Sequence, residues 1–178
     1  MMQKKVQIIS DGSLDLSQDL TKEKDIEVVP FYVSFDSETY QKEMVEVGVR
    51  EFYQEMVDHP TVFPKTSMPS VHDYYEVFEK YAKEQLPVIC ICITRKFSGS
   101  LQSATTAKDM ILEEYPDAQI TVIDSTVNTV LQGLYVLEAC RLRDMGLEYQ
   151  QIVDALLPIR ETCLLYTSDA ADDTPCVD

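Results

Sequence analysis

Two short segments rich in hydroxyl side chains are the part of the sequence best suited to ligand chemistry. Residues 66–70 read Thr-Ser-Met-Pro-Ser, and residues 97–100 read Phe-Ser-Gly-Ser. Each segment comes directly before an expected helix, whose start presents unpaired backbone N–H groups and the positive end of the helix dipole. Hydroxyls and amides placed together can donate hydrogen bonds to a carboxylate or a phosphate. The pattern therefore predicts a site that holds an anionic group.

Other functions remain open from the residues alone. Ser98 could serve as the nucleophile of a hydrolase, and Asp11 as the acceptor in phosphoryl transfer. The sequence contains neither a Gly-x-Ser-x-Gly elbow nor a Walker loop, and His59 and His72 lie at no recognisable catalytic or metal-binding spacing. A small-anion or nucleotide-binding module is a further alternative, although the chain has only 5 glycines and no glycine-rich loop. We expect a binding protein rather than an enzyme, with no cofactor and no metal.

The elements that must position these residues alternate along the chain. Apolar runs predict strands at residues 6–9, 26–29, 87–93 and 120–123. Helical spacing predicts helices at residues 18–24, 49–58, 70–81, 101–114 and 127–145, and another from about residue 148. This alternation is typical of an α/β fold with a parallel sheet flanked by helices.

Small hydroxyl or acidic residues follow three of the expected strands. They occupy residues 10–13, 94–100 and 124–126. In a parallel sheet the carboxyl ends of the strands lie on one edge, and ligands bind in the crevice outside that edge. We therefore expect these three segments to converge on one site.

Composition excludes several partners. The chain has 178 residues, is 45% hydrophobic and carries a formal net charge of −16. Such an acidic protein is a poor match for nucleic acid or for an anionic membrane surface. No apolar run is long enough to span a bilayer, so we expect no integral membrane association and a cytoplasmic location. Cys90 and Cys92 are two apart in an expected strand, so they share a face and are expected to remain reduced thiols.

Several segments taken together resemble the DegV family. They read Ser-Asp-Gly-Ser-Leu-Asp-Leu at 10–16, Val-Val-Pro-Phe at 28–31, Thr-Ser-Met-Pro-Ser at 66–70, Phe-Ser-Gly-Ser-Leu-Gln-Ser-Ala at 97–104 and Val-Ile-Asp-Ser at 122–125. The resemblance covers residues 6–162. It implies a bacterial protein that binds a long-chain fatty acid and presents it to a separate fatty acid kinase subunit, which forms the acyl phosphate.

The resemblance also implies roles for particular residues. Thr66 and Ser98 would hold the carboxylate of the fatty acid. The residues that would shape the head-group pocket are Ser67, Thr94, Gly99 and Ser100. The residues that would support this pocket are Asp11, Ser13 and Ser125.

The chain departs from the family pattern at three places. The usual Asp-Ser near the first strand reads Asp11-Gly12, and the usual Gly-Thr reads Gly99-Ser100. The usual Ser-Ser pair before the Ser-Gly motif reads Thr94-Arg95, which brings a cation next to the expected site. The hydroxyl exchanges preserve hydrogen-bonding capacity.

The last residues continue none of these patterns. Residues 163–178 resemble the translated read-through of a sequencing adapter, so we expect the native domain to occupy residues 1–162. The resemblance implies a second α/β domain that this chain lacks. We expect the chain to carry half of a lipid-binding site.

Overall fold

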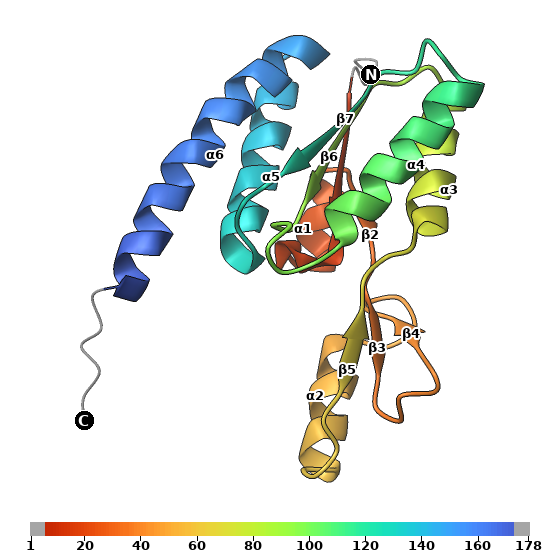
Figure 1. Ribbon diagram of the computed structural model, residues 1–178, viewed down its shortest axis with the longest axis vertical. Coiled ribbons are helices and arrows are strands. Elements are labelled where there is room, and N and C mark those ends of the chain that lie inside the picture. The colour runs from red at the N-terminus through yellow and green to blue at the C-terminus, as the bar shows by residue number, and fades with distance from the viewer. Residues whose placement is uncertain (1–5, 173–178) are drawn as a thin grey trace.

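A four-stranded parallel sheet forms the centre of the molecule. The computed structural model describes residues 6–172, and the surroundings of side chains as far as residue 160. The strands are β1 (Gln7–Asp11), β2 (Ile26–Val29), β6 (Val88–Cys92) and β7 (Ile120–Asp124), in the order β2-β1-β6-β7 (Figure 1). All three pairings are parallel. The predicted α/β fold is confirmed, and β6 is central, as its continuous apolar run indicates.

Helices cover both faces of this sheet. On one face lie α3 (Val71–Lys83) and α4 (Ser100–Glu114). On the other lie α5 (Thr129–Asp144) and α6 (Tyr149–Asp172), while α1 (Gln18–Glu23) lies beside β2 (Figure 1). The predicted helices are all present, and α6 continues past Pro158.

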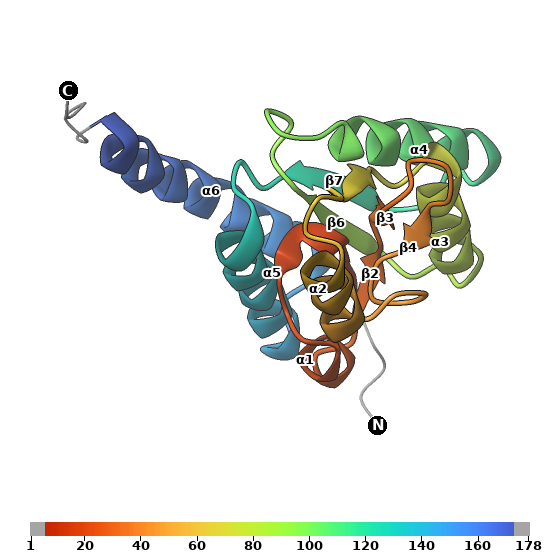
Figure 2. The same cartoon turned by 90° about the horizontal axis from the view of Figure 1, so that it is seen from below.

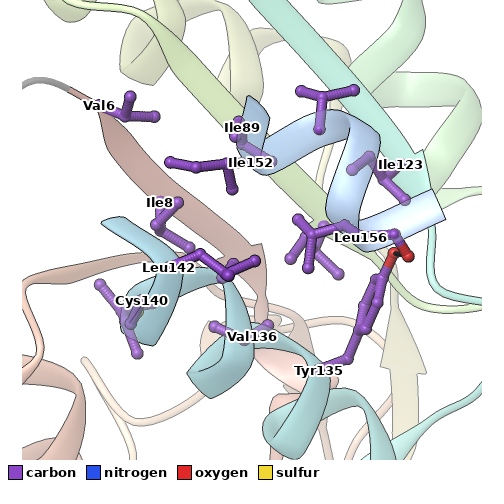
Figure 3. Close-up of a cluster of buried hydrophobic side chains, with 14 of the residues drawn as sticks. Val6, Ile8, Ile89, Ile123, Tyr135, Val136, Cys140, Leu142, Ile152 and Leu156 are labelled. Atoms are coloured by element: carbon purple, nitrogen blue, oxygen red, sulfur yellow. Dashed lines mark hydrogen bonds between the residues drawn. The ribbon is translucent and has the colours of Figure 1, made fainter. Parts of the chain in front are cut away.

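Alternate residues of each strand supply the two layers of the core. From β6, Ile89 and Ile91 pack against α5 and α6, whereas Cys90 and Cys92 pack against α3 and α4. Figure 3 shows the first layer, in which Leu156 of α6 lies among side chains of the sheet and of α5. This alternation follows from the two-residue period of a strand.

A small lobe lies beyond the carboxyl ends of the strands. It consists of the antiparallel strands β3 (Tyr32–Ser34), β4 (Gln41–Lys42) and β5 (Lys65–Ser67), in the order β4-β3-β5, and of the helix α2 (Val49–Asp58). In Figure 1 the lobe lies below the sheet, and in Figure 2, which is seen from below, α2 lies in front of the sheet. The sequence predicted α2 but no strand at residues 65–67, because a strand of three residues is too short to show a period.

Asp73 joins the lobe to the main body. Its Oδ1 accepts a hydrogen bond of 2.7 Å from the Tyr32 hydroxyl of β3 and lies 3.3 Å from Lys42 Nζ of β4. Its Oδ2 accepts from the backbone N–H and the hydroxyl of Ser70, which closes a capping box at the start of α3. Burial raises the pKa of Asp73, but the bonds from Ser70 and Tyr32 outweigh burial and leave this pKa below its usual value. The carboxylate therefore holds β3 and β4 to the start of α3, and β5 pairs with β3.

Within the part of the chain that the structure describes, no helix is long and apolar enough to cross a membrane.

Candidate functional site

The carboxyl ends of β1, β6 and β7 meet at one edge of the sheet, as predicted, and Asp11 is the centre of the hydrogen bonding there. Its side chain is fully buried at the end of β1. Asp11 Oδ2 accepts two hydrogen bonds, one of 2.9 Å from the backbone N–H of Ile93 and one of 2.7 Å from Ser100 Oγ. These two bonds attach the loop between β6 and α4 to the end of β1. Asp11 is therefore a positioning residue for that loop.

The other oxygen of Asp11 reaches α5 through a residue that sequence reasoning missed. Gln132, fully buried, donates from Nε2 to Asp11 Oδ1 at 2.8 Å and to Ser10 Oγ at 3.1 Å. Ser13 Oγ lies 2.7 Å from Asp11 Oδ1 and 2.6 Å from Gln132 Oε1, either of which can take its one proton. One feature of the sequence could have revealed Gln132. The spacing of apolar residues in this helix places position 132 on the core side, where a long polar side chain needs a hydrogen-bond partner.

Gly133 allows this approach of α5. A Cβ atom on Gly133 would lie 2.3 Å from the carbonyl oxygen of Leu14 and 2.9 Å from a side-chain carbon of Leu16. Leu14 ends the 3-10 turn η1 (Gly12–Leu14), which Asp11 caps. A side chain at position 133 would therefore displace the turn that carries Ser13.

Ser100 lies beneath the surface rather than at it. It is fully buried, donates to Asp11 and lies 2.6 Å from the Tyr74 hydroxyl of α3. Since its proton goes to Asp11, Tyr74 donates to it. Tyr74 in turn lies 3.7 Å from Cys92 Sγ, and burial raises the pKa of Tyr74 and of the Cys90 thiol beside Cys92. In this geometry Ser100 supports the loop and presents no free group to a ligand.

The start of α4 is left open for an acceptor. Its cap residue is Gly99, which forms no side-chain cap hydrogen bond. Ser98 Oγ accepts from the N–H of Ser100 at 3.2 Å, so the Ser98 hydroxyl keeps its own proton for another acceptor. The first-turn amides of a helix have no partner within the helix. The Ser98 hydroxyl and the amides of the first turn of α4 together form a group of donors suited to a carboxylate.

Thr66 and Ser67 approach this helix start on β5. Thr66 pairs with Val33 and Ser67 with Tyr32, and both hydroxyl residues are exposed. Successive residues of a strand point to opposite faces, so strand geometry lets only one of the two face a given ligand. The following residue, Met68, places its sulfur 2.6 Å from where a Cβ of Gly99 would lie. The two hydroxyl-rich segments are thus neighbours in space.

Thr94 and Ser125 shape the loops that frame the site. Both are buried. The carbonyl of Thr94 accepts from the N–H groups of Phe97 and Ser98, at 3.0 and 3.3 Å, which closes the turn after β6. Ser125 Oγ donates to the carbonyl of Val127 at 3.0 Å and so forms the turn before α5.

The predicted alternatives have little support in this geometry. Each histidine lies beside a glutamate four residues away, His59 at 2.9 Å from Glu55 and His72 at 3.5 Å from Glu76. In the part of the chain that the structure describes, neither histidine is hydrogen-bonded to Ser98, whose Oγ accepts from the Ser100 backbone amide. Among the described residues, no group of three His, Cys, Asp or Glu side chains is arranged to hold a metal ion.

Comparison with known proteins gives the family. A family model described as "Uncharacterised protein, DegV family" matches residues 5–170. The chain belongs to the DegV family. A DegV domain-containing protein of Clostridium acetobutylicum is 34% identical over 153 residues, which are 86% of this chain and 53% of that protein. A DegV domain-containing protein of Staphylococcus aureus is 32% identical over 158 residues, which are 88% of this chain and 53% of that protein. The chain spans about half the length of these DegV relatives.

Solved DegV structures share the fold. A stearic acid-binding protein from Eubacterium ventriosum is 46% identical, with a TM-score of 0.81 over 85% of this chain and 52% of that one. A DegV family protein from Thermus thermophilus, described by its fatty acid binding, is 29% identical, with a TM-score of 0.74. The match covers 88% of this chain and 54% of that one. These neighbours agree with the fold and the family implied by the sequence motifs. Whether the native domain ends at residue 162 stays a prediction.

Proposed function

We propose that this DegV domain binds a long-chain fatty acid by its carboxylate. The observation that carries the proposal is the start of α4, where the cap residue Gly99 offers no side-chain acceptor to the helix amides. The Ser100 amide donates to Ser98 Oγ, and the Ser98 hydroxyl keeps its own proton for another acceptor. Thr66 brings a further hydroxyl on the adjoining β5, next to Ser67. A carboxylate that receives several hydrogen bonds loses little on leaving water. The fatty acid binding described for the Eubacterium and Thermus neighbours supports this choice of ligand.

Apolar side chains at the same edge suit the acyl chain. Phe97, beside Ser98, is 74% exposed, and Val130 and Leu134 in the first turns of α5 are 56% and 57% exposed. Exposed apolar groups gathered at one edge indicate a surface that something apolar covers. Each buried methylene of a ligand would contribute about 0.8 kcal/mol. The acyl chain, together with the remainder of a longer DegV protein, would cover these side chains.

The whole protein's role follows from holding the ligand rather than changing it. We propose that the domain presents the fatty acid to a separate kinase, which forms the acyl phosphate, and that it needs no cofactor and performs no catalysis itself. The proposal that the domain performs no catalysis is supported by the contacts of the histidines, which among the described residues do not include Ser98. Acyl phosphate should form only when both the kinase and this protein are present. Acyl phosphate made by the protein alone would contradict the assignment.

Two variants test the carboxylate site. Thr66→Val keeps the shape of the side chain and removes its hydroxyl, and Ser98→Ala does the same at the helix start. Each loses one hydrogen bond to a charged group, worth about 1.5–3 kcal/mol, so affinity for a fluorescent fatty acid should fall about tenfold to a hundredfold. Thr61→Val is the matched control, because Thr61 is also exposed in the lobe but lies outside β5.

Equal affinities for the wild type and both site variants would contradict the proposal. A loss with Thr66→Val alone would place the carboxylate on β5 and away from the start of α4.

A further inference from the structure

A cationic cavity adjoins the candidate carboxylate site. It has a volume of about 470 Å³ and lies between the loop after β6, the end of β7 and α6. Three cations line it, Arg95 and Lys96 from the loop and Arg160 from α6. Thr94 lines it as well, and so joins the cavity to the candidate site.

Such a concentration of positive charge is unusual for this chain. The chain carries 15 Lys and Arg against 31 Asp and Glu, yet three of those 15 face one cavity. Among the described residues that line the cavity, Asp124 is the one carboxylate, and its Oδ2 lies 3.7 Å from Arg95 Nε. Asp124 Oδ1 is occupied by the N–H of Thr126 at 2.9 Å. The cavity thus keeps an excess of two positive charges.

Arg160 supplies an independent sign of a missing partner. Its Nε is buried, and within the described part of the chain it has no hydrogen-bond partner. A buried donor without an acceptor is costly, so native structures nearly always satisfy such groups. An anion in the cavity that Arg160 lines would supply the acceptor.

We propose that Arg95, Lys96 and Arg160 form a binding site for a phosphate group, next to the carboxylate site. Phosphate is the better fit than a second carboxylate because its charge near −2 matches the excess of two positive charges. Its oxygens also suit the planar donor fork of arginine. The cavity is larger than a phosphate ion, which leaves room for the group that the phosphate esterifies.

The phosphate could belong to a phosphorylated lipid or be free in solution, and the choice of the lipid source rests on the proposed function. The experiment titrates inorganic phosphate and dodecyl phosphate separately into the isotope-labelled protein and follows the arginine Nε–Hε resonances. Binding should shift the signals of Arg160 and Arg95. A dodecyl phosphate affinity at least about tenfold above that of inorganic phosphate indicates the lipid source, and equal affinities indicate free phosphate.

Variants separate this site from the carboxylate site. Arg160→Gln and Arg95→Ser should each weaken phosphate binding about tenfold and leave the affinity for the fluorescent fatty acid unchanged. Arg95 is 79% exposed, so its variant tests the site even where Arg160→Gln disturbs α6. Arg141→Gln is the control, because Arg141 pairs with Glu138 on the exposed side of α5.

Failure of both phosphates to shift either resonance would overturn the proposal, as would binding that neither variant weakens. Loss of fatty acid binding in the Thr66 and Ser98 variants is measured separately, so failure of one site is distinguishable from failure of the other.

Discussion

Replacing Asp11 by asparagine tests whether this buried carboxylate holds the site together. Asp11 accepts from the Ile93 amide and from Ser100 on one oxygen, and from Gln132 and the turn at Ser13 on the other. Asparagine has one oxygen and one NH₂ group, so one side of the carboxylate becomes a donor that faces donors. A buried donor left unsatisfied costs about 1–3 kcal/mol, and the remaining bonds lose their charge assistance. We expect the free energy of unfolding to fall by about 2–4 kcal/mol.

Urea denaturation of the wild type and Asp11→Asn measures this loss, and amide exchange locates it. The Ile93 amide should exchange faster in the variant under native conditions, since its acceptor is the Asp11 side chain. Asp124→Asn is the matched control, because Asp124 also ends a strand of the same sheet but has an exposed partner at 3.7 Å. That control should lose less than about 1 kcal/mol. A loss for Asp11→Asn no larger than for the control would refute the reasoning.

Three further perturbations test other parts of the fold. Gly133→Ala should destabilise the protein by about 1–3 kcal/mol in a thermal melt, because its Cβ would meet a backbone oxygen at 2.3 Å, and an unchanged melting temperature would contradict this close approach. Leu156→Ala should cost about 2–5 kcal/mol in urea because Leu156 is fully buried, whereas Leu157→Ala, at a position 40% exposed, should cost far less; equal losses would mean that α6 does not pack on the sheet as described. Asp73 has a folded-state pKa below its usual value of 3.8, so the stability it contributes is present above about pH 4 and is lost as the pH falls through the lower, folded-state pKa. Asp73→Asn should therefore flatten the acid side of the curve of urea midpoint against pH, and an unaltered curve would count against the lobe contact.

The parallel sheet was predictable because its signals are local. The apolar run over residues 87–93 is long enough to mark a central strand. The hydroxyl and acidic residues after three of the strands lie together because parallel strands share an edge. A serine followed three residues later by an acidic residue is likewise a local signal of a capping box, and Ser70 and Asp73 form one in the structure. Such features depend only on residues that are neighbours in the chain.

Contacts across long separations were not predictable in the same way. Gln132 reaches Asp11 across 121 positions, and no local pattern assigns a partner to a buried amide. Ser100 was expected near the ligand, but its pairing with Asp11, 89 positions away, turns it inward. The three-stranded lobe sheet was missed because β4 has two residues and β3 and β5 three each. Where Thr66 lies therefore depends on tertiary structure that a short strand does not reveal.

The most direct test of the account is to ask what the folded protein carries. The wild type and Ser98→Ala are purified in parallel, checked for cooperative unfolding, extracted with organic solvent and analysed by mass spectrometry. We predict that the wild type releases a long-chain fatty acid and that Ser98→Ala releases much less. A well-folded wild-type protein that releases no fatty acid and takes up none when it is supplied would contradict the central claim.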